Sequence, residues 1–170
     1  MRGTGDDSHR AITRKNALLV KNVRLAALQD SPNAFSSTYA RESRLTDEDW
    51  ITRTEPLNGE RAAGFLAMDA DIACGMAVGR LERDDARRAD VEAMWVAPRH
   101  RRRGIGRALV DAVLTWARTR GVRGVRLMVT CDNEPAIGLY RGLGFALTGQ
   151  TKPHTHDPSL RDCEMSRSLV

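Results

Sequence analysis

The chain has 170 residues, of which 41% are hydrophobic and 29% are charged, and its formal net charge is +5. This length suits one compact domain with one hydrophobic core. No apolar run approaches the length of a membrane span, so we expect neither an integral membrane protein nor a membrane partner. The polar N-terminus lacks the apolar stretch of a secretory signal and predicts a disordered lead-in over residues 1–9, followed by a single domain over residues 10–170.

The first half of the chain is predicted to be mainly helical, with a hairpin at its end. Apolar residues recur at helical spacing over residues 17–28, and Ser31-Pro32-Asn33 ends that pattern. Thr46 followed by three acidic residues predicts a second helix start, with Thr46 as the N-cap. Two apolar runs over residues 65–69 and 72–80, joined by a short polar turn, predict a β-hairpin.

The second half alternates between strands and helices. A strand is expected over residues 91–96, an amphipathic helix over 104–120 and another strand over 125–129. Asn133 begins a further helix, and the remaining chain can supply two last strands over residues 145–148 and 163–169. This order indicates a mixed α/β sheet covered by helices.

The three cysteines, Cys74, Cys131 and Cys163, are widely spaced and odd in number. No CxxC pair is present, so the spacing indicates neither a disulfide framework nor a zinc site. We therefore expect all three to be small apolar core residues in a protein of the reducing cytoplasm.

Almost all of the positive charge comes from arginine, because Lys15, Lys21 and Lys152 are the only lysines. Such a balance is typical of nucleic-acid-binding proteins, and a dense arginine cluster strengthens that interpretation. The cluster consists of Arg99, Arg101, Arg102, Arg103 and Arg107.

The same cluster has a second interpretation, because it lies where a strand ends and a helix begins. Gly104 and Gly106 open the helix, whose first backbone N–H groups have no internal partners and carry the positive end of the helix dipole. Glycines let a phosphate approach the backbone closely, and neighbouring arginines add charge. The segment therefore predicts a pyrophosphate-binding loop, although it is neither a Walker loop nor a GxGxxG fingerprint.

The order of this loop and a second block resembles the GCN5-related N-acetyltransferase (GNAT) superfamily. The family's R/Q-x-x-G-x-G/A motif stands here as residues 101–106, and the resemblance covers about residues 62–150. The later block of the family pattern stands as Asn133, Ala136, Leu139, Tyr140, Leu143, Gly144 and Phe145.

The resemblance implies a GNAT-like mixed, mostly antiparallel sheet with splayed central strands and helices on both faces. It implies an acetyl-CoA-dependent N-acetyltransferase that moves an acetyl group directly to a primary amine of a small molecule, without a metal. The residues that it implies for binding acetyl-CoA are Met94, Trp95, Val96, Arg101, Arg102, Arg103, Gly104, Ile105, Gly106, Arg107 and Asn133.

Two residues are the candidate catalytic groups. The resemblance places Tyr140 near the thioester sulfur, where a phenol can protonate a departing thiolate. A primary amine is protonated at neutral pH, so a base or a water chain must remove a proton. Glu92 is the best candidate base, since strict alternation puts it on one face with Met94 and Val96. A surface glutamate and a packed core tyrosine are the alternative interpretations.

Two other groups of residues bear on the acceptor. His154 and His156 lie on one side of an extended segment, and we expect them in an exposed loop near the acceptor rather than at a metal. Acidic residues of the N-terminal helical region could attract a cationic amine, although helix N-termini favour acids anyway. These acids are Glu42, Asp47, Glu48 and Asp49.

Other functions and states stay open on the sequence alone. A protein or peptide N-acetyltransferase and a non-catalytic acyl-CoA-binding regulator are the main alternatives. A nucleic-acid-binding module is disfavoured, because no aromatic residues interleave with the arginines, so we expect no nucleic-acid partner. A homodimer is open as well, because dimers are common in the family.

Overall fold

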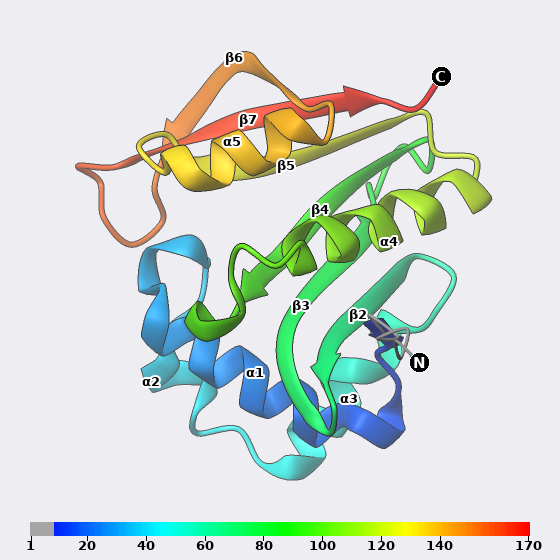
Figure 1. Cartoon of the computed structure of the whole chain (residues 1–170), viewed down its shortest axis with the longest axis vertical. Coiled ribbons are helices and arrows are strands. Elements are labelled where there is room, and N and C mark those ends of the chain that lie inside the picture. Colours follow the sequence, from blue (N-terminus) through cyan, green and yellow to red (C-terminus); the bar gives the residue numbers. More distant parts are fainter. Residues whose placement is uncertain (1–8) are drawn as a thin grey trace, which may run out of the picture.

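The computed structural model describes residues 9–170 and contains a seven-stranded sheet in the order β1-β2-β3-β4-β5-β7-β6 (Figure 1). Neighbouring strands are antiparallel except for β4 and β5, which are parallel. The mixed, mostly antiparallel sheet is therefore confirmed. The strands are β1 (His9–Ala11), β2 (Ala62–Asp69), β3 (Ile72–Leu81), β4 (Arg88–Val96), β5 (Gly124–Thr130), β6 (Ala146–Pro153) and β7 (Arg161–Ser168).

Helices cover both faces of this sheet, as expected (Figure 1). The helices α4 (Ile105–Thr119) and α5 (Glu134–Gly142) lie on one face. The helices α1 (Ala17–Asp30), α2 (Tyr39–Glu42) and α3 (Asp47–Thr54) lie on the other side. Short 3-10 helices complete the set: η1 (Arg14–Asn16), η2 (Pro32–Ala34), η3 (Glu55–Leu57) and η4 (Pro98–His100).

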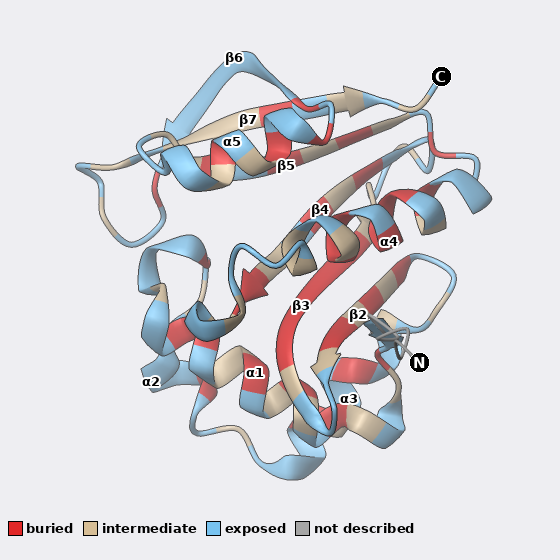
Figure 2. Cartoon of the chain, viewed as in Figure 1, coloured by how far each residue is buried: buried red, intermediate tan, exposed pale blue. Residues whose placement is uncertain are grey.

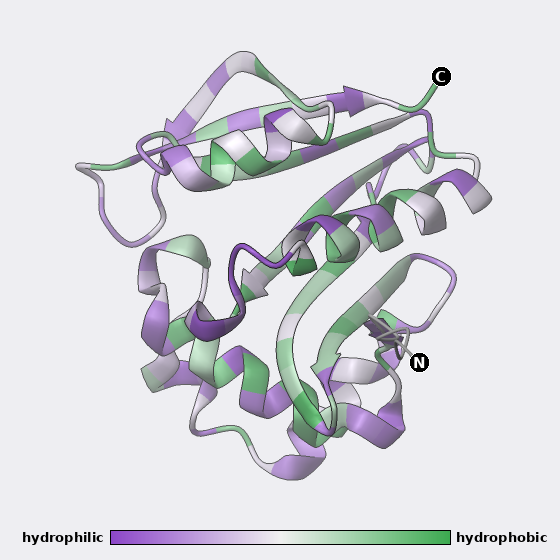
Figure 3. Ribbon diagram, in the orientation of Figure 1, coloured by the Kyte–Doolittle hydropathy of each residue, from purple (hydrophilic) through white to green (hydrophobic). Residues whose placement is uncertain are grey.

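The apolar stripe of α4 forms the larger of two hydrophobic cores. Leu109, Val113 and Ala117 are fully buried against the sheet, while the outer side of the helix is exposed (Figure 2). The second core lies between α1 and the opposite face of β2, β3 and β4. In Figure 3 the segment that leads into α4 is strongly hydrophilic, whereas the strands behind it are hydrophobic. Each core packs against one face of the sheet, so the central strands are held in place from both sides.

Local signals in the sequence fix several element ends. Thr46 caps α3, and its side chain and that of Asp49 satisfy each other's backbone N–H groups. Gly121 has a φ of +72° and follows Arg120, the C-cap residue of α4. Residues 1–8 of the predicted lead-in lie outside the described residues. His9, the last residue of that lead-in, belongs to β1 and pairs with Ala67 of β2.

The two parallel strands separate part-way along their length. β4 and β5 are paired only at Arg88–Gly124, Ala89–Val125 and Asp90–Arg126. Beyond Asp90 the strands diverge, and the β4 backbone edge that faces β5 has no strand partner there (Figure 1). The splayed central strands are therefore confirmed, and they open a gap in the middle of the sheet.

A β-bulge in β4 changes which way its side chains point. Val78 pairs with Glu92 and Met76 pairs with Trp95, so two residues of β4 oppose one residue of β3. Ala93 adopts a φ of +51°, which is uncommon outside glycine. Because of this extra residue, the alternation predicted for β4 is interrupted at its centre.

Two of the three cysteines form a disulfide, so the expectation of three apolar core cysteines is wrong for them. Cys131, the residue after β5, is bonded to Cys163 on β7, with a sequence separation of 32 residues. Cys74 alone is free and buried. The argument for a reducing compartment depended on unpaired cysteines and therefore loses its support. Within residues 9–170, none of the helices has the length and hydrophobicity needed to cross a membrane.

Candidate active site

A cleft of about 710 Å³ occupies the gap between β4 and β5. Its walls come from both strands, from α5, from the segment after α1 and from the end of β6. It therefore joins residues from both halves of the chain. The side chains that define it include Arg24, Asn33, Phe35, Asp90, Glu92, Met94, Arg126, Asn133, Tyr140, Lys152, His154, Asp162 and Glu164.

The N-terminus of α4 presents a row of free backbone N–H groups beside this cleft. None of the N–H groups of residues 102–107 donates to an acceptor within the part of the chain that the structure describes. Gly104 has a φ of +79°, and a Cβ added there would meet no atom within 4 Å, so the space in front of it is open. Such a row of N–H groups at a helix N-terminus is suited to an anion.

Gly106 is closely packed. A Cβ on Gly106 would lie 3.0 Å from Cε of Met94 and 3.3 Å from Cδ2 of Leu139. The glycine thus brings the first turn of α4 close to β4 and α5. Ile105, the residue between the two glycines, packs against the larger core.

The arginines of the loop divide into two groups. Arg102 and Arg103 are exposed and make no ion pair among residues 9–170, and Arg107 lies 4.0 Å from Asp111. Arg101 is directed inward: its Nε donates to the carbonyl of Val96 at 2.9 Å, and its guanidinium is 2.6 Å from Asp30. Arg101 therefore stabilises the loop through protein groups.

Asp30 connects three segments around the end of β4. Its Oδ2 accepts hydrogen bonds from Nε1 of Trp95, the guanidinium of Arg101 and the hydroxyl of Ser31. Burial acts to raise the pKa of Asp30, but these three donors more than offset burial and hold the pKa below its usual value. The charged carboxylate thus links the C-terminus of α1 to the end of β4 and to the glycine loop.

Tyr140 lies on the buried side of α5 and lines the cleft. Its side chain is 7% exposed and contacts the Phe145 ring edge-on. Burial raises the pKa of Tyr140 to about 12. The phenol therefore keeps its proton at neutral pH and can act as a donor.

Asn133 lies at the N-terminus of α5, on the wall of the cleft. Its Oδ1 accepts from the backbone N–H of Ala136 at 3.3 Å, which caps the helix. Its amide Nδ2 donates to no acceptor within residues 9–170. The cap thus leaves both N–H donors of the Asn133 side chain unused.

Glu92 lines the cleft, but it does not share a face with Met94 and Val96. Met94 and Val96 pack on the α4 side, whereas the Ala93 bulge leaves Glu92 on the opposite side of the sheet. The strict alternation predicted for these residues is therefore wrong. The Glu92 carboxylate lies 3.1 Å from Nε of Arg80, and both side chains are partly exposed.

The acidic residues of the N-terminal helices do not form a wall of the cleft. Glu42 is 1% exposed and is paired with Arg24 and Arg53. Burial acts to raise the pKa of Glu42, but the hydrogen bond and charge of Arg24 outweigh it and keep the pKa below its usual value. Asp47 pairs with Lys21, so the idea that these acids attract an amine is not supported.

His154 also departs from its prediction, because it is buried rather than exposed. Both of its ring nitrogens are engaged by protein groups, so His154 and His156 do not form a pair of metal ligands. Sequence analysis also missed the cleft residues Phe35 and Arg126. No local motif marks these residues, because the chain brings them to the cleft from distant elements.

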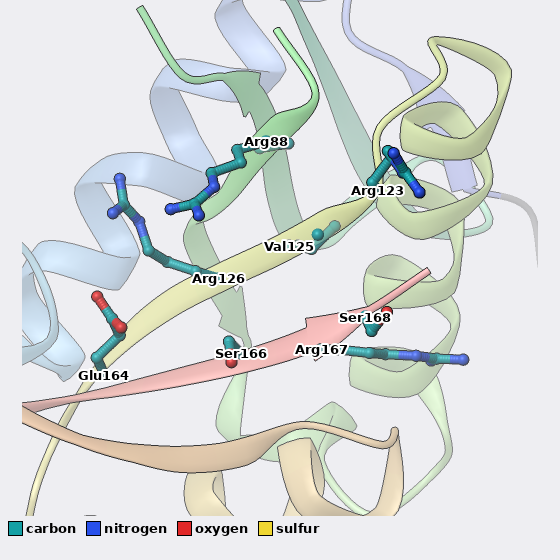
Figure 4. A pocket seen from close by; sticks show the side chains of 10 residues that line it. Arg88, Arg123, Val125, Arg126, Glu164, Ser166, Arg167 and Ser168 are labelled. Carbon is teal, nitrogen blue, oxygen red and sulfur yellow. The ribbon is translucent and has the colours of Figure 1, made fainter. Parts of the chain in front are cut away.

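A second hollow of about 310 Å³ lies where β4 and β5 are still paired. Arg88, Arg123, Arg126 and Arg167 line it, together with Glu164 and two serines. In Figure 4, Arg123 and Arg167 point away from Arg88 and Arg126. Because the four guanidinium groups do not converge, this hollow lacks the arrangement of a phosphate-binding site.

Comparison with known proteins agrees with this architecture. Residues 25–145 match the model of the acetyltransferase (GNAT) family. The chain belongs to this family. The matched range includes the splayed strands, the glycine loop and Tyr140, so the part of the chain that matches the family contains most of the cleft.

Two streptothricin acetyltransferases are similar in sequence. The protein from Escherichia coli is 34% identical over 136 residues, which is 74% of this chain and 78% of that protein. The protein from Streptomyces lavendulae is 47% identical over 62 residues, which is 36% of this chain and 33% of that protein. The chain spans between a third and about half of the length of several other curated relatives.

The fold is shared with a solved structure at low sequence identity. A proposed acetyltransferase from Salmonella typhimurium, solved with its cofactor acetyl-CoA, has a TM-score of 0.80. It is 16% identical, and the match covers 96% of this chain and 94% of that chain. This likeness concerns the fold. Acetyl-CoA is the acetyl donor of the GNAT family.

Proposed function

We propose that this protein is an acetyl-CoA-dependent N-acetyltransferase that transfers the acetyl group directly to a primary amine of a small molecule. The single observation that carries the proposal is the row of free N–H groups over residues 102–107, placed beside the cleft between β4 and β5. A pyrophosphate satisfies such a row, and the exposed guanidinium groups of Arg102 and Arg103 add positive charge there.

The residues present fit acetyl-CoA along the length of the cleft. Open space in front of Gly104 admits the pyrophosphate, and the unpaired edge of β4 beyond Asp90 can bind the amide groups of the pantetheine arm. Asn133 can donate its free amide hydrogen to the same arm. Bound in this way, acetyl-CoA supplies an acetyl group that is already activated as a thioester.

The proton transfers are assigned to two side chains on opposite walls. Glu92, from β4, accepts a proton from the ammonium group of the acceptor, directly or through a water, and leaves a neutral amine. The amine nitrogen forms a bond to the acetyl carbon and gives its surplus proton to solvent, and the bond from that carbon to sulfur breaks. Tyr140, from α5, gives its proton to the departing thiolate and recovers one from solvent.

A small-molecule acceptor is favoured by the nature of the relatives. The two streptothricin acetyltransferases are similar to this chain in sequence and carry a small-molecule name. The Escherichia coli protein is covered over most of its length. Positioning of a small amine also requires a cleft with walls on both sides, which the sheet and the segment after α1 provide here.

Isothermal titration calorimetry with acetyl-CoA tests the donor site, and a panel of primary amines with detection of free thiol tests the reaction. We expect saturable binding of acetyl-CoA, with thiol released only when a small amine is present. A wild-type protein that does not bind acetyl-CoA would sink the proposal.

The remaining outcomes separate the alternative functions. Thiol release with peptides bearing a free N-terminus, and with none of the small amines, would identify a peptide acetyltransferase instead. Binding of acetyl-CoA without turnover of any amine or peptide would indicate a non-catalytic regulator. Tight binding of duplex DNA with a steep salt dependence would favour a nucleic-acid function.

A further inference from the structure

The imidazole of His154 joins two segments that lie 121 residues apart in sequence. Its Nε2 is 2.6 Å from the backbone carbonyl oxygen of Asn33, in η2. Its Nδ1 accepts hydrogen bonds from the backbone N–H groups of His156 at 3.2 Å and Asp157 at 3.3 Å. The side chain is 6% exposed, so these bonds are shielded from water.

This arrangement requires one particular tautomer of the ring. A carbonyl oxygen can only accept, so Nε2 carries the hydrogen, and two N–H groups can only donate, so Nδ1 carries the lone pair. All hydrogen-bonding capacity of the neutral ring is used. The ring is therefore fixed in orientation by three backbone groups.

Both joined segments line the cleft, and we call them its two lips. The first lip is the cleft-lining part of residues 33–36, which contributes the buried ring of Phe35. The second lip is the cleft-lining part of residues 152–155. Neither lip includes a residue of the glycine loop, which Arg101 ties to Asp30, three residues before Asn33. A link between the lips thus fixes their separation where they border the cleft.

We propose that His154 is a positioning residue for the acceptor amine, because it ties the two lips together and sets the width of the acceptor end of the cleft. The inference rests on the proposed function, since it assigns the acceptor to that end. His154 does not touch the reacting atoms in this proposal. Its effect on the acceptor passes through Asn33 and Phe35.

Two substitutions separate the link from the local turn. In His154→Asn the side-chain oxygen can replace Nδ1 and accept the N–H groups of His156 and Asp157, but no donor reaches Asn33. In His154→Gln the longer amide can replace Nε2 and donate to the Asn33 carbonyl, while the local turn loses its acceptor. His156→Asn, in the same loop but exposed, is the matched control.

Amide hydrogen exchange tests the link without any acceptor. In His154→Asn we expect faster exchange within residues 33–36 and unchanged protection at His156 and Asp157. His154→Gln should show the reverse pattern. Equal exchange within residues 33–36 in wild type, His154→Asn and His156→Asn would show that the link does not hold the lip, and would overturn the proposal.

Kinetics with the most active amine of the panel then test the positioning role. His154→Asn should raise the KM for the amine about three- to tenfold, as expected for the loss of one hydrogen bond, and should change the KM for acetyl-CoA less than about twofold. His154→Gln should restore the KM for the amine. An equal rise in both KM values, or no rescue by glutamine, would overturn the positioning role. A wild type that turns over no amine would instead contradict the proposed function, while the exchange result still decides the link.

Discussion

Arg126 holds the carboxylate of Asp90 at the point where β4 and β5 separate. Nε of Arg126 is 2.6 Å from one carboxylate oxygen, and a second guanidinium nitrogen is 3.3 Å from the other. Asp90 and Arg126 are also the last residues that pair in the parallel ladder. The bidentate contact therefore closes the narrow end of the cleft with a charge-assisted bond.

Asp90→Asn is expected to weaken this closure. Because the pair is only partly buried, we expect the free energy of unfolding to fall by about 1–2 kcal/mol and the affinity for acetyl-CoA to fall a few-fold. Urea denaturation and calorimetry measure the two effects. Glu55→Gln removes the acid of the exposed Arg14–Glu55 pair and should cost less than about 0.5 kcal/mol. An equal loss in both variants would show that Asp90 has no special role.

Gly104→Asp should abolish detectable binding of acetyl-CoA, or reduce its affinity at least about tenfold. The new carboxylate would occupy the open space before α4 and repel the pyrophosphate. Gly121→Asp is a matched control, since Gly121 also has a positive φ and open space around it but lies at the other end of α4. Calorimetry should show that this control binds as tightly as wild type. Retained binding in Gly104→Asp would remove the loop from the donor site.

Tyr140→Phe should lower kcat roughly 100-fold, because it removes the proton donor for the departing thiolate. The substitution keeps the ring and its contact with Phe145, so the affinity for acetyl-CoA should change little. Steady-state assays of thiol release with the most active amine measure kcat, and calorimetry measures the affinity. A kcat equal to that of wild type would exclude Tyr140 as the acid.

The raised pKa of Tyr140 also predicts a loss of stability in alkali. Burial raises the pKa of this phenol from 10.0 to about 12, so the folded state holds the proton more tightly than the unfolded state does. The resulting stabilisation is present below pH 10 and is lost as the pH rises to 12, which amounts to roughly 2–3 kcal/mol. Between pH 10 and 12 the free energy of unfolding of wild type should fall, whereas that of Tyr140→Phe should lack this fall, so the difference between the two proteins should shrink or reverse. Tyr39→Phe removes an exposed phenol and keeps Tyr140, so it should lose as much stability in alkali as wild type. An alkaline loss in Tyr140→Phe as large as that of wild type would contradict the assignment.

Reduction of the Cys131–Cys163 disulfide should lower the free energy of unfolding by about 3–4 kcal/mol, given the 32-residue separation of the two cysteines. Denaturation with and without a phosphine reductant measures the difference. The double variant Cys131→Ser, Cys163→Ser should be as stable as the reduced wild type and should not respond to the reductant. Unchanged stability on reduction of wild type would show that the bond does not constrain the chain.

The element order could be predicted from the sequence because local signals agree with the packing. The apolar stripe of α4 follows the helical period and becomes the main core, and Gly104 and Gly121 lie at its two ends. The pyrophosphate loop and Tyr140 could be proposed because they belong to motifs that are contiguous in sequence.

Some features could not be predicted because they depend on a partner that is distant in sequence. The guanidinium of Arg101 contacts Asp30, which lies 71 residues away, so this contact could not be predicted from the glycine loop alone. Cys131 meets Cys163 only because β7 pairs with β5. No glycine in the sequence indicates the single-residue bulge at Ala93, so the alternating pattern predicted the wrong face for Glu92.

The bulge at Ala93 has a consequence for comparing and recombining relatives of this chain. The extra residue shifts the alternation of side chains along β4. Glu92 therefore lies on the face opposite α4, whereas Met94, only two positions later, lies on the α4 face. An alignment that places a gap elsewhere in this strand would assign Glu92 and Met94 to the wrong faces without lowering the apparent similarity. A chimera joined between residues 92 and 94 must therefore keep the number of residues in β4. Deletion of one residue would move every later side chain of the strand to the opposite face of the sheet.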